Sequence, residues 1–97
     1  VGDSYEIEIP NAFTPNSDGI NDTFRPVYYG FKTVDLKVFD TWGTLIYSET
    51  ADGATMTGWN GTLNNKPATN GNYIYQVTGE AYNGETIIKN GPFTLLR

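Results

Sequence analysis

Apolar and polar residues alternate along three stretches of this chain, 4–9, 33–39 and 73–82, and no stretch carries an apolar stripe at helical spacing. A period of two puts successive side chains on opposite faces, which is the pattern of a strand that is buried on one face only. In the middle stretch this pattern turns Val34 and Leu36 inward. We therefore expect an all-β chain.

Turn signals between the alternating stretches predict two hairpins. Residues 41–43 form a turn that leads into a return strand at 44–48. Asn83 and Gly84 predict a type I′ turn, because both residue types tolerate a positive φ. The partner strand then runs over residues 85–89.

The last strand and the long connection before it complete the pattern. Pro92 cannot donate to a ladder, so we expect this strand to be interrupted at 90–92, to be an edge or bulged strand, and to resume at 93–96. Residues 51–72 form a long connection, which Trp59 is expected to pin to the rest of the domain. Six or seven short strands with hairpins and one long connection predict an antiparallel immunoglobulin-like β-sandwich.

Chain length sets the expected domain organisation. The chain has 97 residues, enough for one core that buries roughly 60–65% of the unfolded surface. We interpret residues 1–97 as a single domain, with 1–8 as an upstream linker and first strand and 9–97 as the core. The chain begins at Val1 without a methionine, and we interpret it as part of a longer protein.

The chain contains no cysteine and no histidine. Disulfides and thiolate metal sites are thereby excluded, and the commonest general base is missing. The formal net charge of −5 and the pI near 4.3 argue against nucleic acid or an anionic membrane as a partner. No apolar run approaches the ~18 residues that a membrane span needs. We expect a monomer that is neither an enzyme nor inserted in a membrane.

The opening stretch contains three candidate calcium ligands: Asp18, Asn21 and Asp22. An EF-hand loop built around Gly19 would need carboxylates at its two ends, where Thr14 and Arg25 stand, so that motif fails. The preferred interpretation is an Asx-rich turn in which these side chains cap backbone N–H groups. No cofactor is expected, and calcium at the three residues stays open as the alternative.

Acidic and aromatic side chains offer two further kinds of candidate site. The acids near one predicted hairpin are Asp35, Asp40, Glu49 and Asp52. A glycosidase needs a desolvated acid that faces a second carboxyl group, whereas these acids alternate outward or stand in turns, so we expect a solvated surface. Trp42 and Trp59 could stack against sugars, but both adjoin a glycine in a turn, and packing at the ends of the sandwich is the preferred interpretation.

Five motifs, in order and with their spacing intact, resemble one family. The stretch IPNAFTPNSDGINDTF, residues 9–24, resembles the signature that opens the gliding motility-associated C-terminal domain, the type B sorting domain of the type IX secretion system of Bacteroidetes. The other motifs are a Trp-Gly turn, a Gly-Trp-Asn-Gly-Thr loop, a Pro-Ala-x-x-Gly-x-Tyr-x-Tyr block and the last strand. The motif residues are Pro10, Asn11, Phe13, Thr14, Pro15, Asn16, Asp18, Gly19, Asn21, Asp22, Phe24, Trp42, Gly43, Trp59, Gly61, Gly71, Tyr73, Tyr75, Leu95 and Arg97.

The chain departs from the family pattern at three places. Ser17 stands where glycine is usual, Asp40-Thr41 where Asn-Arg is common, and Asn60 where Asp is common. The change at Asp40-Thr41 removes a positive charge from an exposed turn, which puts a partner contact at that turn in doubt. None of these departures disturbs the predicted strands.

The resemblance implies a C-terminal sorting signal for a large cargo, an adhesin or an extracellular enzyme, that passes through the periplasm and is exported to the cell surface or medium. The implied partners are the outer-membrane translocon and a PorP/SprF-like outer-membrane protein. We expect the opening stretch to pack as an Ω-like plug anchored by Phe13 and Phe24. Residues 73–97 are the expected translocon-binding surface, with Gly91 and Pro92 limiting promiscuous pairing at the edge.

Two other interpretations stay open beside the sorting signal. The first is an immunoglobulin-like module of a surface adhesin that binds glycan, for which an exposed Trp42 or Trp59 would be evidence. The second is a structural spacer stabilised by calcium. A sandwich fold alone does not choose among these functions.

Overall fold

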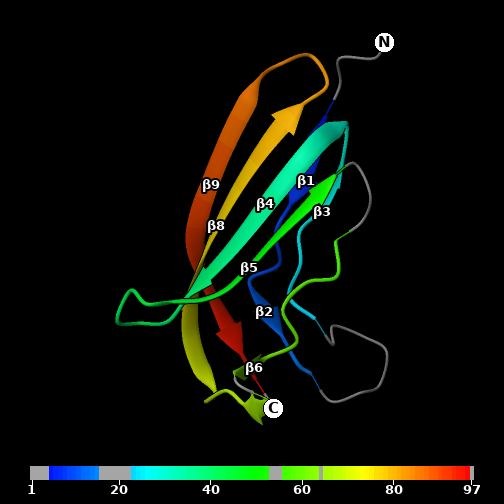
Figure 1. The fold of residues 1–97 in the computed structure, drawn as a ribbon. Coiled ribbons are helices and arrows are strands. Elements are labelled where there is room, and N and C mark those ends of the chain that lie inside the picture. Colours follow the sequence, from blue (N-terminus) through cyan, green and yellow to red (C-terminus); the bar gives the residue numbers. More distant parts are fainter. Residues whose placement is uncertain (1–4, 16–22, 53–55, 64, 97) are drawn as a thin grey trace.

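The computed structural model describes residues 5–15, 23–52, 56–63 and 65–96 (Figure 1). Nine strands follow one another along the chain, and no helix occurs in these ranges. The strands are β1 (Glu6–Glu8), β2 (Ala12–Phe13), β3 (Val27–Tyr29), β4 (Phe31–Phe39), β5 (Leu45–Asp52), β6 (Thr62–Leu63), β7 (Lys66–Pro67), β8 (Gly71–Ala81) and β9 (Thr86–Leu95).

The strands form one main sheet of five and two sheets of two. The main sheet has the order β2-β9-β8-β4-β5, while β1 pairs with β3 and β6 pairs with β7. The all-β sandwich prediction is confirmed, with more strands than the six or seven expected, because segments that appeared to be loops contribute short pairs. One pair departs from the antiparallel prediction, since β2 runs parallel to β9.

The core lies on one face of the main sheet. Val34, Leu36 and Val38 of β4 are fully buried, as their alternation predicted. Ile7, Met56 and other side chains from outside this sheet pack in the same core cluster. In Figure 1 the β1–β3 pair lies behind the main sheet, and the opposite face of the sheet is turned toward the viewer.

The turn between β8 and β9 differs from the predicted type I′. Gly84 has a φ of 93°, whereas Asn83 does not have a positive φ. The Gly84 N–H donates to the Ala81 carbonyl, and the Ala81 N–H donates to the Glu85 carbonyl at 2.8 Å. This is a three-residue turn in which only the last residue is left-handed. The prediction failed because Asn tolerates a positive φ without requiring one.

The predicted interruption of the last strand is wrong. β9 pairs with β8 without a register shift from Thr86 to Leu95, and Pro92 lies opposite Ile74. The Thr94 N–H donates to the carbonyl of Asn11, the residue before β2, and so points toward β2. Groups two residues apart on a strand face the same side. The Pro92 nitrogen therefore points to the outer edge of β9, where the β8 ladder needs no donor. β2 pairs only with Thr94 and Leu95, so among the described residues the rest of β9 is an edge, as predicted.

Candidate functional site

Family-motif residues that are far apart in the sequence meet in one aromatic cluster. Phe24 stacks on Phe93 with ring centroids 3.7 Å apart and an interplanar angle of 10°. Phe13 lies 5.9 Å from Phe24 and 5.7 Å from Trp59, again between ring centroids. Trp59 contacts Tyr73 edge to face at 5.1 Å. The rings come from four of the five motifs and fill one end of the core.

Backbone hydrogen bonds also hold this cluster together. The Phe24 N–H donates to the Trp59 carbonyl at 2.7 Å, and the Trp59 N–H donates to the Phe24 carbonyl at 2.9 Å. Gly58 makes this approach feasible, because its φ is +88° and a Cβ there would lie 2.7 Å from the Phe24 carbonyl oxygen. The loop between β5 and β6 is thus tied to the end of the opening stretch.

The start of the opening stretch joins the last strand. The Thr94 N–H donates to the Asn11 carbonyl at 2.9 Å, and the Leu96 N–H donates to the Phe13 carbonyl at 3.0 Å. Pro10, Thr14 and Pro15 flank this short strand and are partly buried. Leu95 is fully buried and Tyr75 packs against the core cluster. The lower end of Figure 1 gathers β2, β6, the start of β8 and the end of β9.

Glycines and hydrogen bonds hold the loop that leads into β8. Gly61 has a φ of 81°, and its carbonyl accepts from the Ala68 N–H at 2.8 Å. The indole N–H of Trp59 donates to the Thr62 carbonyl at 3.0 Å. The Tyr73 hydroxyl donates to the Thr69 carbonyl at 2.6 Å. The expectation that Trp59 pins this connection is confirmed, since its side chain is buried.

Six motif residues lie outside the described ranges: Asn16, Asp18, Gly19, Asn21, Asp22 and Arg97. The calcium alternative at Asp18, Asn21 and Asp22 therefore stays a prediction. Within the ranges that the structure describes, no group of three or more His, Cys, Asp and Glu side chains could hold a metal ion. Likewise, no helix in these ranges is long and apolar enough to cross a membrane.

Trp42 is the clearest correction to the sequence analysis. Its side chain is 90% exposed, so the predicted packing at the end of the sandwich is wrong for Trp42, although it holds for Trp59. The Asp40 carboxylate accepts from the backbone N–H groups of Trp42 and Thr44, both at 2.9 Å. Gly43 closes the turn with a φ of 85°. This turn projects from the body between β4 and β5 at the left of Figure 1, and so carries the indole into solvent.

Two open grooves flank the beginning of β8 beside this turn. One has a volume of about 560 Å³ and is lined by Asp40, Trp42, Asn70 and Tyr73 among others. The second has a volume of about 530 Å³, and its lining includes Ile74, Pro92 and Thr94. Thr41 and Asn72 line both grooves. Gly71, with a φ of 145°, lines the first.

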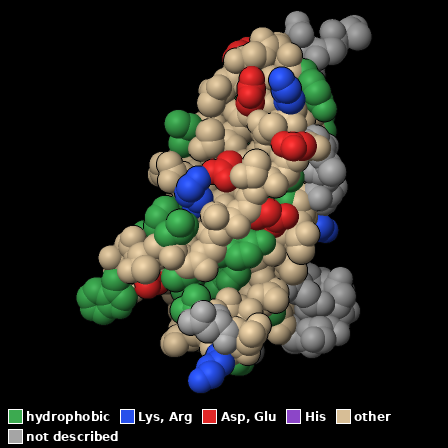
Figure 2. All heavy atoms as spheres, in the orientation of Figure 1, with side chains coloured by type: hydrophobic (Ala, Val, Ile, Leu, Met, Phe, Trp, Pro, Cys, Tyr) green, Lys and Arg blue, Asp and Glu red, His purple; other side chains and the backbone are tan. Residues whose placement is uncertain are grey.

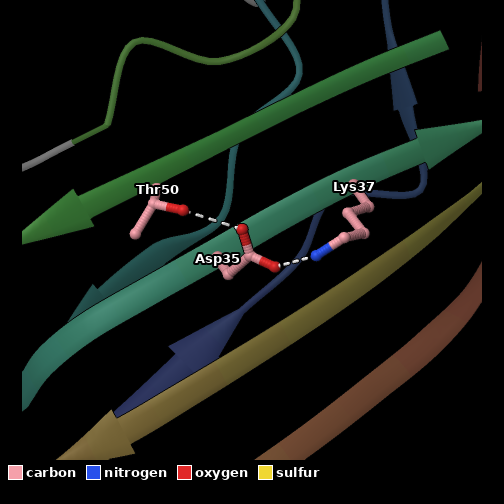
Figure 3. Close-up of polar contacts among 3 residues, drawn as sticks. All are labelled: Asp35, Lys37 and Thr50. Carbon is pink, nitrogen blue, oxygen red and sulfur yellow. Dashed lines mark hydrogen bonds and ion pairs between the residues drawn. The ribbon is translucent and has the colours of Figure 1, made fainter. Parts of the chain in front are cut away.

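The acids near the first hairpin differ in their contacts. Asp35 contacts Lys37 and accepts a hydrogen bond from the Thr50 hydroxyl at 2.9 Å (Figure 3). Asp40 is engaged with its own turn. Asp52 is exposed at the end of β5. The expectation of a solvated surface holds for these acids, and Glu49 is the exception.

Glu49 is a partly buried carboxylate that holds a loop in place. It accepts hydrogen bonds from the Tyr47 hydroxyl at 2.7 Å, the Thr57 N–H at 2.9 Å and the Gly58 N–H at 2.8 Å. Partial burial pushes the pKa of Glu49 upward, but these hydrogen bonds outweigh it and hold the pKa below its ordinary value. Burial first, and then Glu49, raise the pKa of Tyr47.

Acid is expected to weaken this anchor. A carboxyl whose native pKa is lowered contributes stability that is complete above its unfolded pKa of about 4.3 and is lost as the pH falls through the native value. In E49Q the amide nitrogen would face a backbone donor, so the variant should lose about 1–2 kcal/mol at pH 7. It should also lose less further stability than the parent between pH 7 and pH 3. Urea unfolding at both values measures this, and equal losses in the two proteins would contradict it.

Comparison with known proteins agrees with this fold. A crystal structure of CopC from Methylosinus trichosporium OB3b superposes with a TM-score of 0.51 over 93% of this chain and 88% of that chain, at 11% identity. At that identity the likeness shows the fold alone. No curated protein matches this sequence.

The fold is a β-sandwich, and the aromatic residues of the converging motifs lie in its core. A family model described as a CHU_C Type IX secretion signal domain matches residues 7–95. The chain therefore belongs to this family, as the motifs of residues 9–97 indicated. Its role is that of a sorting signal, which acts with the secretion machinery in export across the outer membrane to the surface or medium. The family suggests a non-catalytic role.

Sequence reasoning did not identify Met56 and Ile74 as site residues, and it named Gly58 only as part of the Gly-Trp-Asn-Gly-Thr motif. The burial of Met56 and the close approach of Gly58 to Phe24 depend on contacts between segments that are far apart in the sequence. Ile74 is 43% exposed on the outer face of β8. The sequence did carry a signal for Ile74, because it is an apolar residue at a position that strict alternation assigns to solvent.

Proposed function

We propose that this domain directs a cargo protein joined to it through the periplasm and across the outer membrane by the type IX secretion system. The cargo would be an adhesin or an extracellular enzyme, and the receptor would be the translocon with a PorP/SprF-like outer-membrane protein. Residues 9–97 would be the core of the sorting unit, and residues 1–8 would supply its first strand, in which Ile7 packs in the core, and its connection to the cargo. Family membership supports the sorting role.

The observation that carries the proposal is the convergence of the motifs in one core. Phe13, Phe24, Trp59 and Phe93 are almost completely inaccessible to solvent, so a receptor cannot read these side chains directly. Their contribution is to hold one particular fold, which then presents a surface. The signal is therefore recognised as a folded domain rather than as a linear peptide.

Because the end of β9 is buried, deleting it does not test where the receptor binds. Phe93 and Leu95 are 1% and 0% exposed, so deletion of residues 93–97 would remove core side chains. We expect that deletion to abolish export through unfolding. Loss of export after the deletion would not locate the receptor surface, for which exposed residues are needed.

Export of a reporter tests the proposed function. A signal peptide and a fluorescent protein are fused before residues 1–97 and expressed in a host that carries this secretion system, with and without the cognate PorP/SprF-like protein. We expect fluorescence at the cell surface or in the medium when that protein is present. A fusion without residues 1–97 is the control. Retention of the complete fusion in the periplasm in the presence of the partner would contradict the proposal.

One observation favours glycan binding as a second candidate function. The exposed indole of Trp42 stands beside a groove with Asn and Thr side chains, and such combinations of an aromatic ring with polar groups suit carbohydrate ligands. Retention of the purified domain on neutral polysaccharides, abolished in W42A, would support this function. An unchanged elution volume on every polysaccharide would exclude it for those ligands.

A further inference from the structure

Four apolar residues stand in one row across four strands of the main sheet. Leu45 pairs with Phe39, Phe39 with Ile74, and Ile74 with Pro92. Their sequence neighbours Val38, Tyr73 and Phe93 are buried, so Phe39, Ile74 and Pro92 lie on the opposite, outer face. Leu45 is 48% exposed and Ile74 is 43% exposed. Trp42 lies in the turn that joins Phe39 to Leu45 and is therefore next to this row. We name the four residues, together with the adjacent Trp42, the outer apolar row.

The outer apolar row differs from the adjacent row of the same face, although Ile88 further along β9 is also apolar and 61% exposed. The next outward positions on the paired strands are Lys37, Ser48, Gln76 and Asn90, which are all polar. Figure 2 looks onto this face, where hydrophobic side chains gather over the lower part of the sheet and most acidic ones lie above them. Apolar side chains are therefore concentrated in this row, and the row next to it is polar.

Charge on this face is unbalanced toward acid. Asp35, Asp52 and Glu80 occupy outward positions in the main sheet. Lys37, at an outward position of β4, is engaged with Asp35, and Lys32 near the start of β4 is a second, exposed cation. Opposite charges across an interface speed association and fix its orientation. A partner of this face should therefore place lysine or arginine opposite Asp52 and Glu80.

The width and charge of the outer apolar row limit which kind of ligand could cover it. Four strands spaced by about 4.8 Å place its ends roughly 14 Å apart, which is wider than a single sugar ring that stacks on Trp42. A second copy of this chain would bring the same acids face to face, and an anionic membrane would repel them. A protein surface with an apolar centre and a basic rim satisfies both the width and the charge.

We infer that the outer apolar row is the surface on which the secretion machinery docks, with the Trp42 indole entering an apolar pocket of a protein partner whose rim is basic. This inference rests on the proposed function and locates the receptor surface that it requires. Trp42 is held by a hydrogen-bonded turn, and Trp is among the residue types that dominate binding energy at interfaces. Its removal need not disturb the fold, because the side chain is almost entirely in solvent.

The test uses the reporter fusion with variants at exposed positions. W42A should reduce the exported fraction at least about tenfold, as expected for a binding hot spot. I74T, which keeps a β-branched residue in β8, and the charge reversal E80K should reduce it several-fold. Y82A is the matched control, because Tyr82 is a 65% exposed aromatic residue in the turn between β8 and β9. Thermal unfolding of each purified domain should match the parent.

The outcomes separate this inference from the proposed function. If the parent fusion is not exported, the proposed function fails and this inference fails with it. If the parent, W42A and I74T are exported equally, the inference is wrong and the sorting function stands. Equal losses in Y82A and W42A would also overturn it, because the effect would not belong to this face. Trp42-dependent retention on neutral polysaccharide without any effect on export would identify a glycan site instead.

Discussion

Replacement of Phe24 by alanine is expected to lower the free energy of unfolding by about 3–5 kcal/mol. Phe24 is fully buried and contacts the rings of Phe13, Tyr75 and Phe93, so truncation removes ring contacts and leaves a cavity. A domain of this size is stable by only about 5–15 kcal/mol. The melting temperature should therefore fall by roughly 12 °C or more, and the F24A fusion should lose export because little of it stays folded.

Urea unfolding followed by tryptophan fluorescence measures the stability change, since Trp59 lies in the same cluster. Y29A is the matched control, because Tyr29 is 58% exposed and its truncation should cost less than about 1 kcal/mol. A loss of under 1 kcal/mol in F24A would contradict the structural role that we give to the aromatic cluster. So would normal export of a variant that is shown to be unfolded.

Gly58 and Gly43 offer a matched pair for the second large effect. Both have a left-handed backbone, with φ values of +88° and +85°, but only Gly58 is crowded. A Cβ at Gly58 would lie 2.7 Å from the Phe24 carbonyl oxygen and 2.8 Å from the Arg25 Cβ, whereas nothing lies within 4 Å at Gly43. G43A should cost about 1–2 kcal/mol for the backbone alone. G58A should cost about 2–5 kcal/mol, because the clash also separates Phe24 from Trp59.

The comparison of the two alanine variants isolates the clash from the backbone strain. Urea unfolding should place G58A well below G43A in stability. Amide hydrogen exchange should show faster exchange at Phe24 and Trp59 in G58A, because their N–H groups donate to each other's carbonyls. Equal stabilities in the two variants would mean that the paired loop is not held as described.

The long strands could be predicted from the sequence because the information is local. Apolar and polar residues alternate in β4 and β8 because one face of each strand is buried, and Gly84 indicated the turn between β8 and β9. The turn geometry was missed because the left-handed conformation falls on Gly84 alone. Pro92 suggested an interruption because its strand was considered without its neighbours. The direction in which its nitrogen points depends on the sheet order, which a local pattern does not contain.

The two tryptophans mark the limit of sequence reasoning about the site. Each adjoins a glycine in a turn, and local sequence alone does not distinguish them. Trp59 is buried because Phe24, which precedes it by more than thirty residues, pairs with it across the domain. Trp42 is exposed because Asp40 and Gly43 close a short turn that extends past the sheet. Long-range pairing therefore decided which aromatic residue is structural and which is available to a partner.

We propose that the secretion machinery recognises the sorting signal on the folded domain. Export of a fluorescent fusion that carries only residues 71–97, compared with the fusion that carries residues 1–97, tests it most directly. The shorter fusion keeps β8, β9 and the end of the chain but lacks Phe13, Phe24 and Trp59, which complete the core. We predict export of the longer fusion and periplasmic retention of the intact shorter one. Equal export of the two fusions would contradict the account, because a linear signal in the last hairpin would then suffice.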